Sequence, residues 1–261
     1  MITASGGIVY HARAARSLIK LLNPLGSWNP TRRHVSSWVN EWVELHKFKT
    51  LILVGPSAAY LIERQHWPEL EQVILIEPDR LAKWIFNRRK ITTAHACQWI
   101  HRSDLLPYFS REPDEFFKFL QNYDPQTTGI LFFGCLGQMA FHEKEYSRPE
   151  RESRLLLLHA TRQFKVASLH DLASVVVPTM SAKLARDVSE LQLHFDGSAY
   201  CSATLTGLIK QVSDFLLFHP SLQAWTDHDT YWLGVPNKVC VWSLTRTRIH
   251  ILGFTSQLPH S

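Results

Sequence analysis

Residues 50–79 read TLILVGPSAAYLIERQHWPELEQVILIEPD, and this stretch decides the fold. Residues 51–54 and 73–76 are short aliphatic runs, typical of strands buried on both faces of a parallel sheet. About twenty residues separate them, enough for one crossover helix and its turns. In such sheets, ligands bind in the crevice beyond the carboxyl ends of the strands. Gly55 ends the first run and Glu77 ends the second, so we expect both residues at that crevice.

Strand-like and helix-like segments alternate along the rest of the chain. Pro30 precedes a helical pattern of apolar residues that runs to Leu45, with Thr31 as a plausible N-cap. Another helix is expected over residues 80–89. Further strands are expected at residues 91–99, 129–133 and 165–169, and further helices at residues 116–120 and 151–164. This alternation predicts a doubly wound α/β domain.

The carboxyl-terminal part of the chain predicts two additions to this domain. Residues 239–244 and 248–254 are strand-like and so closely spaced that they must form an antiparallel hairpin. Residues 172–237 are too many for one return helix, so we expect a cap insertion with helices at residues 181–193 and 204–218. We divide the chain into an N-terminal helical segment, residues 1–47, and an α/β domain, residues 48–261.

Composition limits the compartments and the binding partners that we expect for the protein. The 261 residues are 45% apolar, and no apolar run is long enough to span a bilayer. The four cysteines are scattered without a CxxC pair, which favours neither zinc nor disulfides and suits a reducing cytoplasm. The net charge of +5 is mildly basic, but residues 87–90 resemble a helix end more than a nucleic-acid patch. A nucleic-acid partner is therefore not favoured, no membrane partner is expected, and the oligomeric state is open.

With these strands and the terminal hairpin, the chain resembles the class I S-adenosylmethionine-dependent methyltransferases over roughly residues 47–258. The resemblance implies a mostly parallel seven-stranded sheet whose last strand is inserted antiparallel, with S-adenosylmethionine as cofactor. The family's first motif corresponds to VGPSAA, residues 54–59, in which only Gly55 is glycine. Pro56 has no N–H to offer, whereas Ser57 can cap a following helix and offer its hydroxyl. The resemblance makes these three residues cofactor-binding candidates.

Two further motifs follow in order. In VILIEPD, the resemblance gives Glu77 the role of binding the ribose hydroxyls, the alternative being a solvated carboxylate at a strand end. Asp79 is expected to be the N-cap of the following helix. In HRSDLL, the resemblance places Asp104 and Leu105 against the adenine, and a helix cap at Ser103 or Asp104 is equally compatible with the sequence.

The fourth position, FFGCLGQ, follows the strand at residues 129–133. Gly134 is a further cofactor-binding candidate there, and Gln138 a substrate-binding candidate. Cys135 is most simply a small buried apolar residue. Subfamilies that methylate exocyclic amines carry Asp/Asn-Pro-Pro-aromatic at this position, and this chain does not, so the acceptor stays open.

Three polar groups of residues are candidates for acceptor chemistry. His170 and Asp171 stand at the expected carboxyl end of the fifth strand, and His228 lies within Asp227-His228-Asp229. A histidine beside a carboxylate can act as a general base, so we take the catalytic candidates to be His170, Asp171 and His228. The N-terminal segment could fold over the crevice, and its substrate-binding candidates are Tyr10, His11 and Arg13. No metal is expected, because no ligand set has a recognisable spacing.

The sequence thus predicts an S-adenosylmethionine-dependent methyltransferase with an unidentified, small-molecule acceptor. Methyl transfer asks mainly for positioning and exclusion of water, so a missing acid–base motif does not exclude it. The alternative is a catalytically inactive protein that keeps this fold as a binding or scaffold module. A nicotinamide dehydrogenase would need a fuller glycine pattern, and an RNA methyltransferase stays open on the basis of charge.

Overall fold

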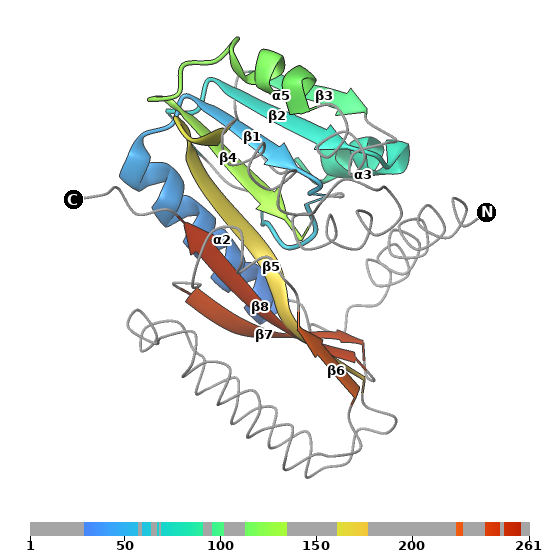
Figure 1. Ribbon diagram of the computed structural model, residues 1–261. Helices are drawn as coiled ribbons and strands as arrows, with labels where there is room; N and C mark the ends of the chain where they lie inside the picture. The colour runs from blue at the N-terminus through green and yellow to red at the C-terminus, as the bar shows by residue number, and fades with distance from the viewer. Residues whose placement is uncertain are drawn as a thin grey trace.

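The computed structural model describes residues 29–56, 59–63, 67, 69–90, 96–101, 113–134, 161–176, 223–226, 238–245 and 248–256. Within them the helices are α2 (Asn29–His46), α3 (Arg80–Arg89) and α5 (Pro113–Leu120). The strands are β1 (Thr50–Val54), β2 (Gln72–Glu77), β3 (Ala96–His101), β4 (Thr128–Phe133), β5 (Lys165–Val176), β6 (Gln223–Thr226), β7 (Lys238–Thr245) and β8 (Arg248–Ser256). Figure 1 shows these strands in one twisted sheet.

The sheet is mixed and mostly parallel at its amino-terminal strands. Its order is β3-β2-β1-β4-β5-β8-β7, and β6 pairs with β5 off this path. Strands β1 to β5 pair with one another in parallel, whereas β6, β7 and β8 pair antiparallel. The α/β class and the mostly parallel sheet are confirmed. The sheet has eight strands rather than the expected seven, because β6 forms within the residues that we assigned to the cap.

The last strand of the chain lies inside the sheet. β8 runs antiparallel between β5 and β7, so that both of its backbone edges are paired. β5 is also longer than expected, since it continues past residue 169 to Val176. Figure 1 shows β5 passing from the parallel strands to the part of the sheet formed with β6 and β8. These two antiparallel partners satisfy the backbone N–H and C=O groups of the extended part of β5. The sequence alone did not predict this extension.

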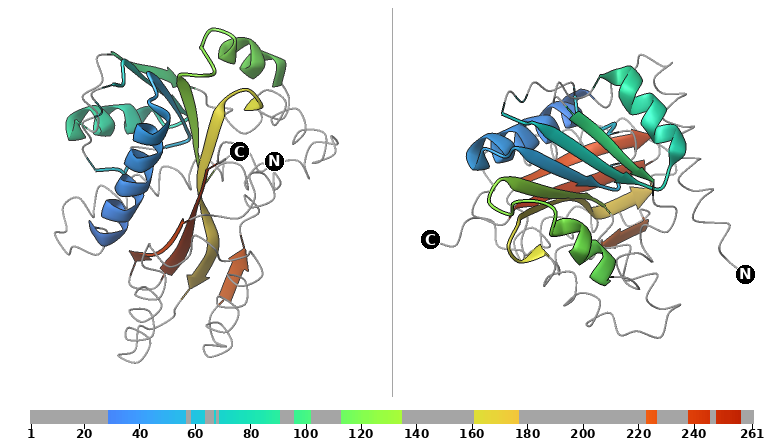
Figure 2. Two further views of the ribbon diagram at one scale, coloured as in Figure 1. Left: turned by 90° about the vertical axis from the view of Figure 1, so that its left-hand side faces the viewer. Right: turned by 90° about the horizontal axis from the view of Figure 1, so that it is seen from above.

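The central strands are buried on both faces, as their aliphatic sequences predict. Leu51 and Leu53 of β1 join an apolar cluster with α2, and Ile52 and Val54 join a second cluster with α5. Successive side chains of a strand point to opposite faces, so the two clusters lie on the two sides of the sheet. Figure 2 shows α2 and α3 on one side and α5 on the other.

Helix α2 covers the first of these faces. It begins at Asn29, two residues before the expected N-cap Thr31, because proline is well tolerated in the first turn of a helix. The ring of Trp42 packs edge-on against Phe48, with 4.7 Å between centroids. Through such contacts, α2 is fixed to the sheet just before β1 begins.

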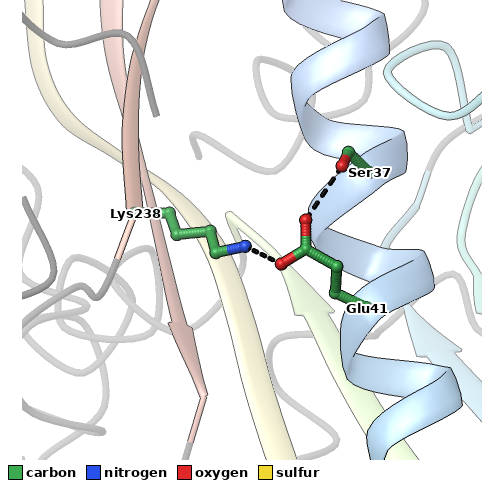
Figure 3. A network of polar contacts seen from close by, with 3 residues as sticks. All are labelled: Ser37, Glu41 and Lys238. Carbon is green, nitrogen blue, oxygen red and sulfur yellow. Dashed lines mark hydrogen bonds and ion pairs between the residues drawn. The ribbon is translucent and has the colours of Figure 1, made fainter. Parts of the chain in front are cut away.

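A polar contact also joins α2 to β7. Lys238, the first residue of β7, donates to Glu41 Oε2, and Ser37 Oγ donates to Glu41 Oε1 over 2.9 Å (Figure 3). Burial pushes the pKa of Glu41 upward, but the hydrogen bonds from Lys238 and Ser37 and the charge of Lys238 outweigh it. The pKa therefore lies below its ordinary value of 4.5, which means that folding favours the charged carboxylate.

Candidate functional site

Gly55 and Glu77 lie together at the edge of the sheet where β1, β2 and β4 end, called here the carboxyl edge. The register pairs Val54 with Ile76, so the next residue of each strand stands at the same level. The N–H of Gly55 donates to the carbonyl of Ile76 over 2.9 Å. Gly55 has φ of +66°, which glycine adopts without strain. The structure therefore brings together the two residues on which the sequence interpretation depends.

The carboxylate of Glu77 is buried, with 1% of the residue exposed, and is not the solvated group that we considered as the alternative. Its Oε1 accepts from the N–H of Asp79 over 3.0 Å. A buried carboxylate needs such donors, because desolvation without them is costly. Part of the acceptor capacity of Glu77 is thus used within its own turn.

Asp79 begins α3, as expected. Its Oδ1 accepts from the N–H of Leu81 over 2.8 Å, and its backbone is extended, as an N-cap requires. The residue is buried, with 4% exposed. Asp79 is therefore a structural cap beside the carboxyl edge.

His101 reaches the same edge and was missed by the sequence interpretation. It is the last residue of β3 and stands opposite Glu77 in the register. Arg80 Nε donates to His101 Nε2 over 3.2 Å, so this nitrogen accepts, and Nδ1 then carries the hydrogen toward the Glu77 carbonyl at 3.3 Å. We expected this strand to end at residue 99. Its parallel register with β2 would have placed the histidine correctly.

Gly134 and His170 occupy the part of the edge near β4 and β5. Gly134 has φ of +58°, and its N–H donates to the carbonyl of Leu169 over 2.7 Å. His170 is the next residue of β5 and has 1% of its surface exposed. On its other side, the register pairs His170 with Gly253 of β8. His170 therefore has a glycine on each neighbouring strand near its own level, Gly253 on β8 and Gly134 at the end of β4.

The sequence placed His170 and Asp171 at the end of a strand, and this is wrong because β5 continues through both of them. His170 is nevertheless the first residue beyond the parallel pairing with β4, which ends at Phe133 and Leu169. The backbone register of β5 and β8 shifts between Asp171 and Ala173. His170 consequently lies at the level of the carboxyl edge even though its strand does not end there.

The connection between β1 and β2 differs from the expected crossover helix. Its described residues form turns and no helix. Ala59 has φ of +50°, a left-handed conformation that interrupts a right-handed helix, and its N–H donates to the Pro56 carbonyl over 2.8 Å. Arg89 of α3 donates to the carbonyls of Ala59 and Ile62 over 2.8 and 2.9 Å. Both carbonyls thus accept from another element of the fold, and that of Ala59 also accepts from the N–H of Ile62 over 2.9 Å.

Tyr60 belongs to this connection, and its side chain packs against α3. The guanidinium carbon of Arg89 is 5.4 Å from the centre of its ring, and the ring packs against Ala82 and Ile85. Burial raises the pKa of Tyr60, the Arg89 charge opposes the rise, and the Asp79 carboxylate adds to it. Burial also lowers the pKa of Arg89 to about 10. The connection therefore packs onto α3 through one aromatic ring and one partly buried cation.

Several predicted site residues lie outside the part of the chain that the structure describes: Tyr10, His11, Arg13, Ser57, Asp104, Leu105, Cys135, Gln138, Asp227, His228 and Asp229. The backbone of Asp171 is described but its side chain is not. The expected helices at residues 181–193 and 204–218 also fall outside. The described residues contain no group of three or more His, Cys, Asp or Glu that could hold a metal. Nor does any helix among them have the length and apolar character to cross a membrane.

The sequence matches no protein-family model and no curated protein. Solved structures with a similar course of chain include the methyltransferase domain of bacterial CtHen1, at 10% identity and a TM-score of 0.38, covering 86% of this chain and 99% of that one. Magnesium protoporphyrin IX methyltransferase (ChlM) from Synechocystis PCC 6803, with bound SAH, matches at 9% identity and a TM-score of 0.34, covering 86% and 82%. The assignment of a class I methyltransferase-like fold rests on the strand order, with its last strand antiparallel inside the sheet.

Proposed function

We propose that this protein is an S-adenosylmethionine-dependent methyltransferase acting on a small-molecule acceptor in the cytoplasm. The observation that carries the proposal is the pairing of Gly55 and Glu77 at one level of the carboxyl edge. Glycine leaves room for close approach, and a carboxylate at the neighbouring strand end can accept from ribose hydroxyls. The scattered cysteines favour a reducing compartment such as the cytoplasm.

The residues present fit an adenosyl group at the Gly55–Glu77 end of the edge. Oε1 of Glu77 accepts from the N–H of Asp79, and one carboxylate can accept several hydrogen bonds at once. Ser57, Asp104, Leu105 and Gly134 remain the other proposed cofactor residues. S-adenosylmethionine, when bound, supplies an electrophilic methyl group with its own leaving group.

The rest of the proposed machinery lies toward β5. His170 is a buried imidazole at the level of the edge and would hold the proton that the acceptor loses. Two adjacent glycine positions, Gly134 and Gly253, leave backbone rather than side chains beside it. The other proposed contributors are Asp171, His228, Tyr10, His11, Arg13 and Gln138.

Calorimetric titration with S-adenosylmethionine and with its demethylated product tests the cofactor. We expect binding by the wild type and a loss of at least about tenfold in Glu77→Ala, since a charge-assisted hydrogen bond is worth about 1.5–3 kcal/mol. Glu71→Ala is the matched control, because Glu71 is an exposed acid at the opposite end of β2. Absence of heat at millimolar ligand, or equal losses in the two variants, would remove the cofactor from the proposal.

A non-catalytic binding module is the second candidate, and the connection between β1 and β2 favours it. Its described residues form no helix whose N-terminus could face a ligand, and Glu77 is partly engaged by its own turn. Such a protein would bind neither adenosyl compound, and Gly55→Ala would change stability alone. Cofactor binding that Gly55→Ala weakens would exclude this candidate.

A further inference from the structure

One face of α3 carries an exposed tryptophan among cations. Trp84 is 55% exposed, and the guanidinium carbon of Arg88 lies 5.6 Å from the centre of its ring. The exposed polar and aromatic positions of this surface, called the α3 face, are Arg80, Lys83, Trp84, Asn87, Arg88 and Lys90. A large flat apolar ring left in solvent and bracketed by positive charge is a stacking platform for a planar group.

Neither acidic neighbours in α3 nor its helix dipole accounts for all the positive charges of the α3 face. Residues 80–90 contain no Asp or Glu, so no acid within the helix partners these cations. The helix dipole favours cations at the carboxyl end, which accounts for Arg88 and Lys90. Arg80 and Lys83 lie near the amino end, where the dipole disfavours them. An external polyanion would offset that cost.

The α3 face is held rigidly from behind. Ala82, Ile85 and Phe86 are buried, and Arg89 is bound to the carbonyls of the β1–β2 connection. The helix is also capped at both ends, by Asp79 and by Lys90 in a left-handed conformation. A platform fixed in this way loses little conformational entropy when a ligand stacks on it.

We propose that the α3 face binds single-stranded nucleic acid, with a base stacked on Trp84 and phosphates held by Lys83 and Arg88. Stacking needs unpaired bases, which a duplex does not offer, and the cations suit a phosphate backbone. The contact between Arg80 and His101 joins one end of this face to the carboxyl edge, so a bound strand would pass beside it. The inference stands whether or not the protein binds a cofactor.

Fluorescence anisotropy with a labelled oligouridine of about 12 nucleotides tests the proposal at roughly 50 mM salt. Trp84→Ala should weaken binding about tenfold, within the range measured for loss of one base–aromatic stack. Trp84→Phe should retain most of the affinity. Lys83→Ala with Arg88→Ala should lower the slope of log affinity against log salt by roughly 1.4, because each phosphate contact on a single strand contributes about 0.7.

The opposite side of the sheet provides matched controls. α5 also presents an exposed aromatic residue next to an exposed cation, Phe117 and Lys118. Phe117→Ala and Lys118→Ala should leave the affinity unchanged. Equal losses at both helices, absence of oligonucleotide binding, or Trp84-dependent binding to anionic vesicles alone would each overturn the proposal. So would binding of duplex as tightly as single strand with no effect of Trp84→Ala. Substitutions at Glu77 should not alter oligonucleotide affinity, which separates this test from that of the cofactor.

Discussion

The two connections that flank β2 have nearly equal lengths and opposite structures. Residues 78–95 contain α3, a helix with an acidic N-cap and a left-handed residue at its end. The described part of residues 55–71 contains only turns, and its left-handed residues, Gly55 and Ala59, come soon after β1. Lys90 is left-handed at the exposed end of a helix, whereas Ala59 is left-handed in the core, in a connection whose described residues form no helix. A left-handed residue thus follows the helix in one connection, whereas left-handed residues follow the strand closely in the other.

The β1–β2 connection depends on α3 for hydrogen bonds more than α3 depends on the connection. Two carbonyls of the β1–β2 connection accept hydrogen bonds from Arg89, whereas the helical hydrogen bonds of α3 form within the helix. α3 serves as the scaffold, and the glycine-containing connection is held against it. We expect substitutions to reveal this asymmetry in the following order.

Arg89→Met should have the largest effect. It leaves the carbonyl of Ile62 without this donor, and it removes one of two donors from the carbonyl of Ala59, which also accepts from the N–H of Ile62. An unsatisfied buried group costs about 1–3 kcal/mol, so we expect a loss of that size in the free energy of unfolding, measured in urea. Arg88→Met is the control, because Arg88 is exposed and should change stability by less than about 0.5 kcal/mol. Similar losses in both variants would show that the hydrogen bonds from Arg89 do not stabilise the β1–β2 connection.

Asp79→Ala should have an intermediate effect, confined to α3. The N–H of Leu81 loses its acceptor, and removal of an N-cap costs about 1 kcal/mol. Asp79→Asn keeps a capping oxygen and should recover most of that loss. Thermal unfolding followed by circular dichroism measures both variants. A loss in Asp79→Asn as large as that in Asp79→Ala would mean that the charge, rather than the cap, stabilises the helix.

Glycine substitutions at the two left-handed positions should sharpen the comparison. Lys90→Gly removes a conformational cost of about 1 kcal/mol at an exposed site and should raise the free energy of unfolding by up to that amount. Ala59→Gly removes the same cost but also a buried methyl worth about 0.8 kcal/mol, so its net effect should be close to zero. Paired urea titrations would detect the difference. Equal stabilisation at both positions would contradict the packing of Ala59.

The contact between Lys238 and Glu41 lies outside both connections and should give the smallest effect, visible through pH. Because the folded pKa of Glu41 is lowered, its contribution to stability is present above the unfolded pKa and is lost as pH falls through the folded pKa. The free energy of unfolding should fall less steeply below pH 4.5 in Lys238→Met than in the wild type. Lys118→Met, an exposed cation on α5, should leave the slope unchanged.

Much of the fold could be predicted because its strands are buried on both faces. Continuous aliphatic runs identified β1, β2 and β4, and the equal level of parallel strand ends brought Gly55 and Glu77 together. The acid cap at Asp79 was also predictable, since its cause lies within two residues. Features of this kind can be predicted because the residues that cause them lie within or next to the element concerned.

The features that were missed have long-range causes. The extension of β5 depends on backbone partners in β6 and β8, far along the chain. The left-handed Ala59 accepts a hydrogen bond from a guanidinium 30 residues away, a contact that the local sequence does not indicate. His101 could be found only from the register of β3 against β2.

The hydrogen bond from Arg89 to Ala59 also sets an order of events during synthesis. The ribosome releases the β1–β2 connection first, whereas Arg89 is encoded 30 residues after Ala59. Until α3 has emerged and docked, both carbonyls lack the donor that Arg89 supplies. The contacts that hold the β1–β2 connection in place are thus completed by a residue translated after it.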